Sequence, residues 1–112
     1  MTIEYKDTKE FTAEELERLF LSGKWSSGAY PDRLVVALRN SDTVLSAWDG
    51  QRLVGLINVL DDSIMTAYIH YLLVDPEYQG HGIGRELTRR VLDRYKDYLR
   101  ILLVSYEDGV AF

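Results

Sequence analysis

A glycine-rich segment, residues 79–84, constrains the fold of this chain more than any other part of its sequence. It reads Gln-Gly-His-Gly-Ile-Gly and follows an apolar run at residues 69–74, which has the composition of a strand covered on both faces. A long amphipathic helix is predicted after it, with an apolar stripe formed by Ile83, Leu87, Val91 and Tyr95. The start of a helix stabilises an anion through its unpaired N–H groups, and glycine lets a ligand approach because it has no Cβ. The segment therefore predicts a cradle for a phosphate or a diphosphate.

The spacing of the glycines separates the known kinds of phosphate cradle. A P-loop needs Gly-Lys-Ser/Thr at its end, whereas Gly84 is followed by Arg85. A dinucleotide-binding fold needs G-x-G-x-x-G directly after the strand, but here the glycines run G-x-G-x-G after five intervening residues, 75–79. Glu107 lies about where a ribose-binding acid stands in that fold, so a nucleotide-binding domain stays open as a minor alternative.

The rest of the sequence predicts a mixed α+β sandwich with helices over a central sheet, in one domain spanning residues 1–112. Thr12 and Glu15 form a capping box that predicts a helix start. Asp49-Gly50 is a hairpin signal. The expected elements are a strand at 2–6, helices from Thr12 to Ser22-Gly23 and from Pro31 to Asn40, strands at 44–48, 52–60 and 65–74, the helix after the glycines, and a buried strand at 101–104.

Composition excludes several classes of function. The chain has 13 Lys and Arg against 18 Asp and Glu, a formal charge of -5, which argues against an electrostatic nucleic-acid binder. It has no Cys and only two His, His70 and His81, so we expect no metal site. No apolar run approaches the roughly 20 residues of a membrane span, and no secretory leader is visible, so we expect a cytoplasmic protein without a membrane partner.

Residues 73–84, Leu-Val-Asp-Pro-Glu-Tyr-Gln-Gly-His-Gly-Ile-Gly, closely resemble the acetyl-CoA signature of the GNAT-type N-acetyltransferases, Gln/Arg-x-x-Gly-x-Gly/Ala. Gln79, Gly82 and Gly84 occupy its three fixed positions. The hairpin at residues 49–55 and the order of elements are similar to that family as well. The resemblance implies a GNAT-like acyl-CoA N-acyltransferase fold, whose central and mostly antiparallel sheet is flanked by helices.

The resemblance also implies the cosubstrate and its binding residues. In the family, loop and helix N–H groups hold the diphosphate of acetyl-CoA, and the pantetheine arm bonds to the backbone of the preceding strand. The residues expected to bind it are Leu72, Leu73, Val74, Gln79, Gly80, His81, Gly82, Ile83, Gly84 and Arg85.

Catalysis requires a base that takes a proton from the acceptor amine. The usual acidic position of the family aligns with His70, and Tyr71 lies beside it, so these two are the candidate catalytic residues. A hydrogen-bonded strand histidine is the alternative interpretation of His70. Trp25 and Tyr30 align with residues that shape the acceptor pocket, but core aromatics explain them equally well.

The family continues beyond the last predicted strand with a helix whose Tyr is often the general acid, and this chain stops at Phe112. An apolar strand at residues 101–104 would then lie at a sheet edge, which is prone to pairing. We therefore expect a second copy to cover that edge, or a longer protein that is incomplete here at its C-terminus. The resulting hypothesis is an acetyl-CoA-dependent N-acetyltransferase acting on a primary amine of a small molecule or peptide; the alternative is a truncated, non-catalytic CoA-binding or interaction module.

Overall fold

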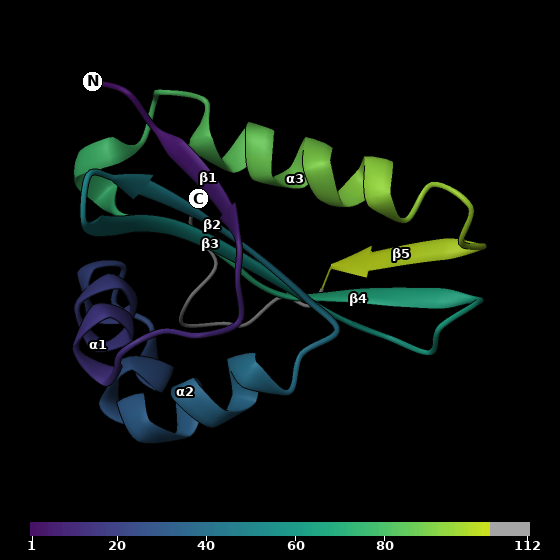
Figure 1. Ribbon diagram of the computed structural model, residues 1–112, viewed down its shortest axis with the longest axis horizontal. Coiled ribbons are helices and arrows are strands. Elements are labelled where there is room, and N and C mark those ends of the chain that lie inside the picture. The colour runs from purple at the N-terminus through teal and green to yellow at the C-terminus, as the bar shows by residue number, and fades with distance from the viewer. Residues whose placement is uncertain (104–112) are drawn as a thin grey trace.

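The computed structural model describes residues 1–103 as a five-stranded sheet with helices on both faces (Figure 1). The sheet order is β1-β2-β3-β4-β5; the pairs are antiparallel except for the parallel pair β4 and β5. This confirms the predicted mixed α+β architecture. The elements are β1 (Glu4–Asp7), α1 (Ala13–Ser22), the 3-10 turn η1 (Ser26–Ala29), α2 (Pro31–Arg39), β2 (Thr43–Asp49), β3 (Arg52–Asp61), β4 (Thr66–Val74), the 3-10 turn η2 (Pro76–Tyr78), α3 (Ile83–Arg94) and β5 (Arg100–Leu103).

The two faces of the sheet carry separate cores. Figure 1 shows α1 and α2 on one face and α3 on the other. The α1/α2 core contains Phe20, Leu56 and Leu73 among its buried residues, and the α3 core contains Ile57, Leu72 and the predicted helix stripe. That stripe, Ile83, Leu87, Val91 and Tyr95, is at most 4% exposed. Burial of this stripe seats α3, and with it the glycine-rich loop, on the sheet.

The N-terminal helices begin where the sequence predicts. Thr12 Oγ1 accepts a hydrogen bond from Glu15 N–H at 3.1 Å, and the Thr12 N–H donates to Glu15 Oε1 at 2.9 Å, which completes the capping box. Pro31 occupies the first turn of α2. The η1 turn lies between the two helices in the chain.

Two predicted elements differ in detail. The first strand is shifted from residues 2–6 to Glu4–Asp7. In the β2–β3 hairpin the loop residues are Gly50 and Gln51, because Asp49 pairs with Arg52, and only Gly50 takes a positive φ, 61°. This correction moves the turn by one residue.

The prediction of a buried strand at residues 101–104 is wrong where the structure describes it. In β5, Leu102 is 41% and Leu103 is 51% exposed, because this strand is the outermost one of the sheet formed by residues 1–103. Val104 and Glu107 lie outside the described residues. Within residues 1–103, no helix has both the length and the apolarity to cross a membrane.

Candidate functional site

The glycine-rich loop lines an open cavity at the start of α3. Gly80 and Gly82 have φ of 85° and 80°, in the left-handed region where a Cβ is strained. A Cβ built on either residue would meet no atom within 4 Å, so both glycines border empty space. The cavity has a volume of about 370 Å³ and is lined by Val74, Tyr78, Gln79, Gly80, Gly82, Ile83, Gly84 and Arg85.

This cavity has the electrostatics of an anion site without a cluster of basic side chains. Gly82 is the N-cap of α3, and the first three residues of the helix, Ile83, Gly84 and Arg85, line the cavity. The first N–H groups of a helix lack intrahelical acceptors and carry a partial positive charge. Arg85 makes no ion pair with any residue of 1–103, so its charge is available there.

The loop is anchored to the sheet through Asp75, whose side chain is 3% exposed. Its carboxylate accepts hydrogen bonds from Arg18 Nη1 at 2.9 Å, from the Glu77 N–H at 3.0 Å and from Arg52 Nη2 at 3.2 Å. Burial raises the pKa of Asp75, but the bonds from Arg18, Glu77 and Arg52 outweigh it and the pKa is lowered overall. The Asp75 N–H also donates to Val54 O at 2.8 Å. Asp75 therefore joins the loop to α1 and β3.

A second anchor joins the loop to the β2–β3 hairpin. The Tyr78 hydroxyl donates to Asp49 Oδ2 at 2.6 Å, and this bond, followed by burial, raises the pKa of Tyr78. The Arg52 guanidinium lies over the Tyr78 ring, 5.4 Å from its centroid, and pairs with Glu77 at 3.2 Å. Neither anchor is predictable from the local sequence. The acid next to Pro76 was visible, but the arginines that bind it are 57 and 23 residues away.

Close packing between α3 and β3 sets the position of the helix start. A Cβ on Gly55 would lie 2.9 Å from Ile83 Cγ2 and 3.4 Å from Leu87 Cδ1. Gly55 therefore allows the first turn of α3 to approach the sheet. The glycine itself was visible in the sequence, but nothing there indicated which helix it faces.

A β-bulge brings the two candidate catalytic residues together. Asn58 of β3 pairs with Tyr71, and the next residue, Val59, pairs with Ile69, so the register skips His70, which is the extra residue of a β-bulge in β4. Ile69 and Leu72 both belong to the α3 core, although side chains three positions apart in a regular strand point to opposite faces. The alternation is therefore interrupted at the two residues between them. The rings of His70 and Tyr71 stack at 4.2 Å between centroids, with an interplanar angle of 26°.

The surroundings of these two rings differ. His70 is half-buried, and burial lowers its pKa, so the imidazole is neutral at physiological pH. Tyr71 is 8% exposed, shares a hydrogen bond of 2.8 Å with Ser27 Oγ and makes edge contacts with Phe20 and Trp25. His70 therefore keeps contact with solvent, while Tyr71 is held within the α1/α2 core.

A second hollow, of about 190 Å³, lies beside Tyr71 between η1 and α2. Tyr30, which is 54% exposed, lines it, and the Arg33 guanidinium lies 5.1 Å from the Tyr30 ring centroid. Trp25 is 6% exposed and packs in the core behind Tyr71. The lining residues are Ser27, Tyr30, Arg33, Leu34, Ala37 and Tyr71. The structure thus brings Tyr30 and Tyr71 to one hollow and places Trp25 beneath it.

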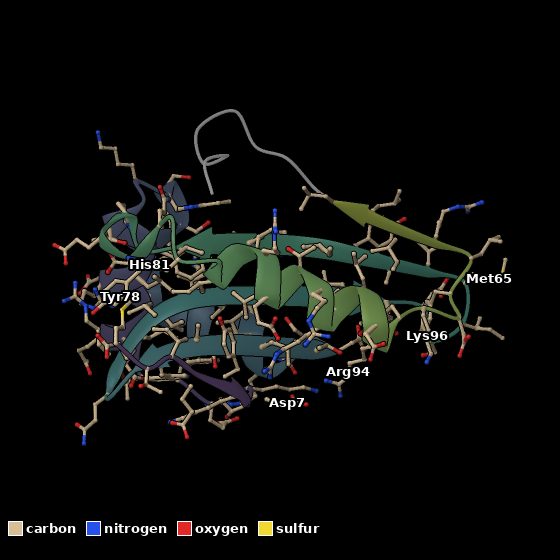
Figure 2. All side chains as sticks on the ribbon, turned by 90° about the horizontal axis from the view of Figure 1, so that it is seen from above. Asp7, Met65, Tyr78, His81, Arg94 and Lys96 are labelled. Carbon is tan, nitrogen blue, oxygen red and sulfur yellow. The ribbon has the colours of Figure 1, made fainter. Side chains whose placement is uncertain are left out.

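Of the remaining predicted binding residues, Val74 lines the cavity, whereas Leu72, Leu73 and His81 do not. The side chains of Leu72, Leu73 and Val74 are at most 5% exposed and belong to the two cores. β5 pairs with residues 66–69 of β4, and within residues 1–103 no strand pairs with Leu72, Leu73 or Val74 on that edge. His81 is exposed in the loop. Figure 2 shows His81 and Tyr78 at the opposite end of the molecule from Met65.

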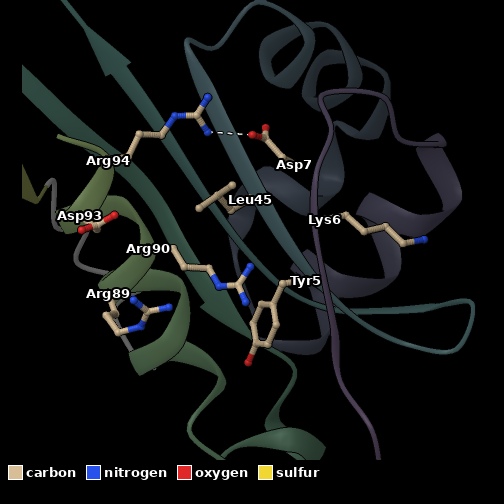
Figure 3. Close-up of a pocket in the computed structure, with 8 residues that line it drawn as sticks. All are labelled: Tyr5, Lys6, Asp7, Leu45, Arg89, Arg90, Asp93 and Arg94. Carbon is tan, nitrogen blue, oxygen red and sulfur yellow. Dashed lines mark hydrogen bonds and ion pairs between the residues drawn. The ribbon is translucent and has the colours of Figure 1, made fainter.

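Another groove of similar size, about 350 Å³, lies between β1 and α3 (Figure 3). Its arginines are engaged by neighbouring side chains. Arg94 pairs with Asp7 at 2.8 Å, and Arg90 pairs with Glu86 at 2.7 Å while lying over the Tyr5 ring. The glycine-rich loop is therefore a better candidate for an anion site than this groove. Within residues 1–103 no group of three or more His, Cys, Asp or Glu side chains is placed to hold a metal ion.

Comparison with known proteins identifies similar chains. Residues 8–109 match the model of a family described as Acetyltransferase (GNAT) family. The uncharacterized N-acetyltransferase ycf52-like of Prochlorococcus marinus is 32% identical over 117 residues, which cover 99% of this chain and 64% of that protein. This chain therefore spans less than two thirds of the length of that relative.

Solved structures of similar fold include a GNAT family acetyltransferase from Streptococcus pneumoniae TIGR4, with a TM-score of 0.80 and 28% identity; the match covers 95% of this chain and 77% of that one. A probable acetyltransferase from Staphylococcus aureus has a TM-score of 0.83 at 18% identity, with 94% of this chain and 80% of that one covered. The second likeness is one of fold alone.

Proposed function

The chain belongs to the GNAT family of acetyltransferases, and on this premise we propose that it binds acetyl-CoA at the glycine-rich loop and transfers the acetyl group to a primary amine of a small molecule or peptide. The observation that carries the proposal is the open cavity at Gly80 and Gly82, where a ligand can approach the first N–H groups of α3. The diphosphate of CoA is an anion, and the start of a helix next to a glycine-rich loop binds anions of this kind.

The residues around the cavity fit the rest of the cosubstrate. Arg85, without an ion-pair partner in residues 1–103, supplies a positive charge for phosphate. The backbone edge of Leu72, Leu73 and Val74 lies beyond the part of β4 that pairs with residues 100–103, and its N–H and C=O groups suit the amides of the pantetheine arm. The bound molecule then runs from α3 along β4 toward His70.

His70 is the proposed base. Because burial lowers its pKa, it is neutral at physiological pH and ready to accept a proton from the amine, directly or through water. The amine nitrogen then forms a bond to the thioester carbonyl carbon, the C–S bond breaks, and the leaving thiolate takes up a proton. The amide and free CoA are the products.

The hollow beside Tyr71 is the proposed acceptor site. It lies on the α1/α2 face, where the stacked rings of His70 and Tyr71 are, and the exposed ring of Tyr30 forms one wall. Trp25 contributes indirectly, because its buried ring packs against the Tyr71 ring and holds that ring in place.

Calorimetry with CoA and acetyl-CoA, followed by thiol release over a panel of primary amines, tests the proposal. We expect both cosubstrates to bind and at least one amine to release thiol at a rate that requires the protein. Binding without amine-dependent thiol release would favour a non-catalytic CoA-binding module. Competition by NAD or ATP in place of CoA would favour a nucleotide-binding domain, and no binding of CoA or acetyl-CoA would refute the proposal.

A further inference from the structure

The bulge in β4 is bonded to a buried side chain of the neighbouring strand. Asn58 of β3 is 1% exposed, and its Oδ1 accepts a hydrogen bond from the Tyr71 N–H at 2.8 Å. Its Nδ2 donates to Ser41 Oγ at 3.0 Å, and Ser41 Oγ donates to Ala37 O at 2.9 Å. This chain of bonds, here called the Asn58 bridge, runs from the bulge through Ser41 to α2.

The direction of the carboxamide in the Asn58 bridge is determined by its partners. A backbone N–H can only donate, so the Asn58 oxygen must face Tyr71, and the NH₂ group then faces Ser41. Ser41 Oγ can accept this bond because its own proton goes to Ala37 O. Every polar group of the bridge is thus satisfied inside the core, where an unpaired group is costly.

The position of the bridge is important because the extra residue of the bulge, His70, determines the face of the sheet to which the His70 and Tyr71 rings point. Side chains alternate along a strand, so a shift of one residue would exchange the faces of all residues beyond it. The bulge allows His70 and Tyr71 to stack together and returns Leu72 to the α3 core. A bulge interrupts the regular ladder, and here a side chain supplies a bond at the interruption.

We propose that Asn58 is a positioning residue, which holds the bulge of β4 through the Asn58 bridge so that His70 stacks on Tyr71, one of the residues that line the proposed acceptor hollow. The assignment of a catalytic task to His70 rests on the proposed function. The placement of the two rings by Asn58 does not rest on the proposed function, and it can be measured separately.

The test compares Asn58→Leu with a matched control. Asn58→Leu keeps the branched outline of the side chain, with methyl groups bulkier than the carboxamide atoms, and removes both bonds of the carboxamide. Thr43→Val is the control, because it removes another buried hydrogen bond, between Thr43 Oγ1 and the Tyr95 hydroxyl at 2.6 Å, on the α3 face of the sheet. Asn58→Asp keeps an oxygen for the Tyr71 N–H, and Ser41→Ala removes only the outer partner of Asn58.

The first readout is the NMR signal of the His70 ring. Stacking on Tyr71 at 4.2 Å predicts upfield-shifted ring protons in the wild-type protein. We expect Asn58→Leu to move these signals toward the values of free histidine, Ser41→Ala to move them less, and Thr43→Val to leave them unchanged. This readout requires neither cosubstrate nor acceptor.

The second readout separates kcat from binding. Misplacement of a reacting group by about 1 Å costs up to roughly a hundredfold in rate, so Asn58→Leu should lower kcat by about tenfold to a hundredfold. CoA affinity should fall much less than kcat, because Asp75 and Tyr78 hold the diphosphate cradle independently of the bulge. Asn58→Asp should recover most of the lost turnover.

Unchanged His70 signals and kcat in Asn58→Leu would overturn the inference, and so would Asn58→Asp behaving like Asn58→Leu. If Asn58→Leu does not fold, unchanged His70 signals in Ser41→Ala would overturn it. Suppose that the wild-type protein does not bind CoA, but that Asn58→Leu shows the predicted change in the His70 signals. This result would refute the proposed function and leave the positioning role intact.

Discussion

The conformation of Gly82 leads to a quantitative prediction for Gly82→Asp. Its φ of 80° is open to Asp and Asn at a cost of about 1 kcal/mol of unfolding free energy, because these residues tolerate the left-handed region better than others. A Cβ there meets no protein atom within 4 Å, so no steric loss adds to this cost. Thermal unfolding should shift down by roughly 4 to 8 °C.

The effect of Gly82→Asp on CoA binding should be much larger than its effect on stability. A carboxylate about 4 Å from a phosphate charge costs between about 1 kcal/mol in water and about 4 kcal/mol near a protein surface. This range corresponds to a loss of about 5-fold to about 1,000-fold in affinity. Gly82→Asn has the same shape without the charge, so the difference between the two variants measures repulsion alone and should shrink as salt is added.

Gly50→Asp is the matched control for this experiment. Gly50 also has a positive φ, 61°, and open space around it, but it lies in the β2–β3 turn and does not line the cradle. Calorimetric titration with CoA and thermal unfolding should show a similar stability loss in both Asp variants and weak binding in Gly82→Asp only. Wild-type affinity in Gly82→Asp, or an equal loss in Gly50→Asp, would refute the placement of the diphosphate.

Four further predictions concern the proposed base, the loop anchor and the packing of α3 on the sheet. Because burial lowers the pKa of His70, the acid limb of the kcat/KM profile should lie below pH 6.5 and disappear in His70→Ala; an identical limb in the variant would show that another group is the base. Because the pKa of His70 is lower in the folded than in the unfolded chain, the unfolded chain binds more protons there, and the free energy of unfolding decreases as pH falls below 6.5. Denaturant unfolding of His70→Ala should show a smaller decrease over the same pH range. Asp75→Asn should lose about 1.5 to 3 kcal/mol of unfolding free energy and weaken CoA binding, because charge-assisted bonds from Arg18 and Arg52 are lost; wild-type CoA affinity would show that the anchor does not shape the loop. Gly55→Ala should cost about 1 to 3 kcal/mol in the same assay because its Cβ would overlap Ile83, and a neutral effect would mean that α3 can move away from the sheet.

The parts of the fold that the sequence predicted correctly depend on local chemistry. The Thr12 capping box, Pro31 at the start of α2 and the glycines before α3 each act within a few residues of chain, so their spacing is enough to identify them. The apolar stripe from Ile83 to Tyr95 is also local, and it is buried as predicted.

The parts that were missed depend on contacts between distant segments. Nothing near Asn58 in the sequence indicates that its amide bonds Tyr71 across the sheet, and no residue type marks the bulge at His70. The apolar residues of β5 suggested burial, but an apolar run is buried only when another layer or strand covers it, and β5 lies at the edge of the described sheet, where the sequence also led us to expect it. Position in the sheet, which is a tertiary property, determined the outcome.

The central claim is that the N–H groups of the glycine-rich loop hold CoA, and an amide NMR titration of the wild-type protein with CoA tests it most directly. We predict that the largest shifts fall on Gly80, Gly82 and Gly84, which line the cradle. Tyr5 and Arg90, in the groove between β1 and α3, should be unaffected. Shifts concentrated in that groove, or no shifts at saturating CoA, would contradict the account.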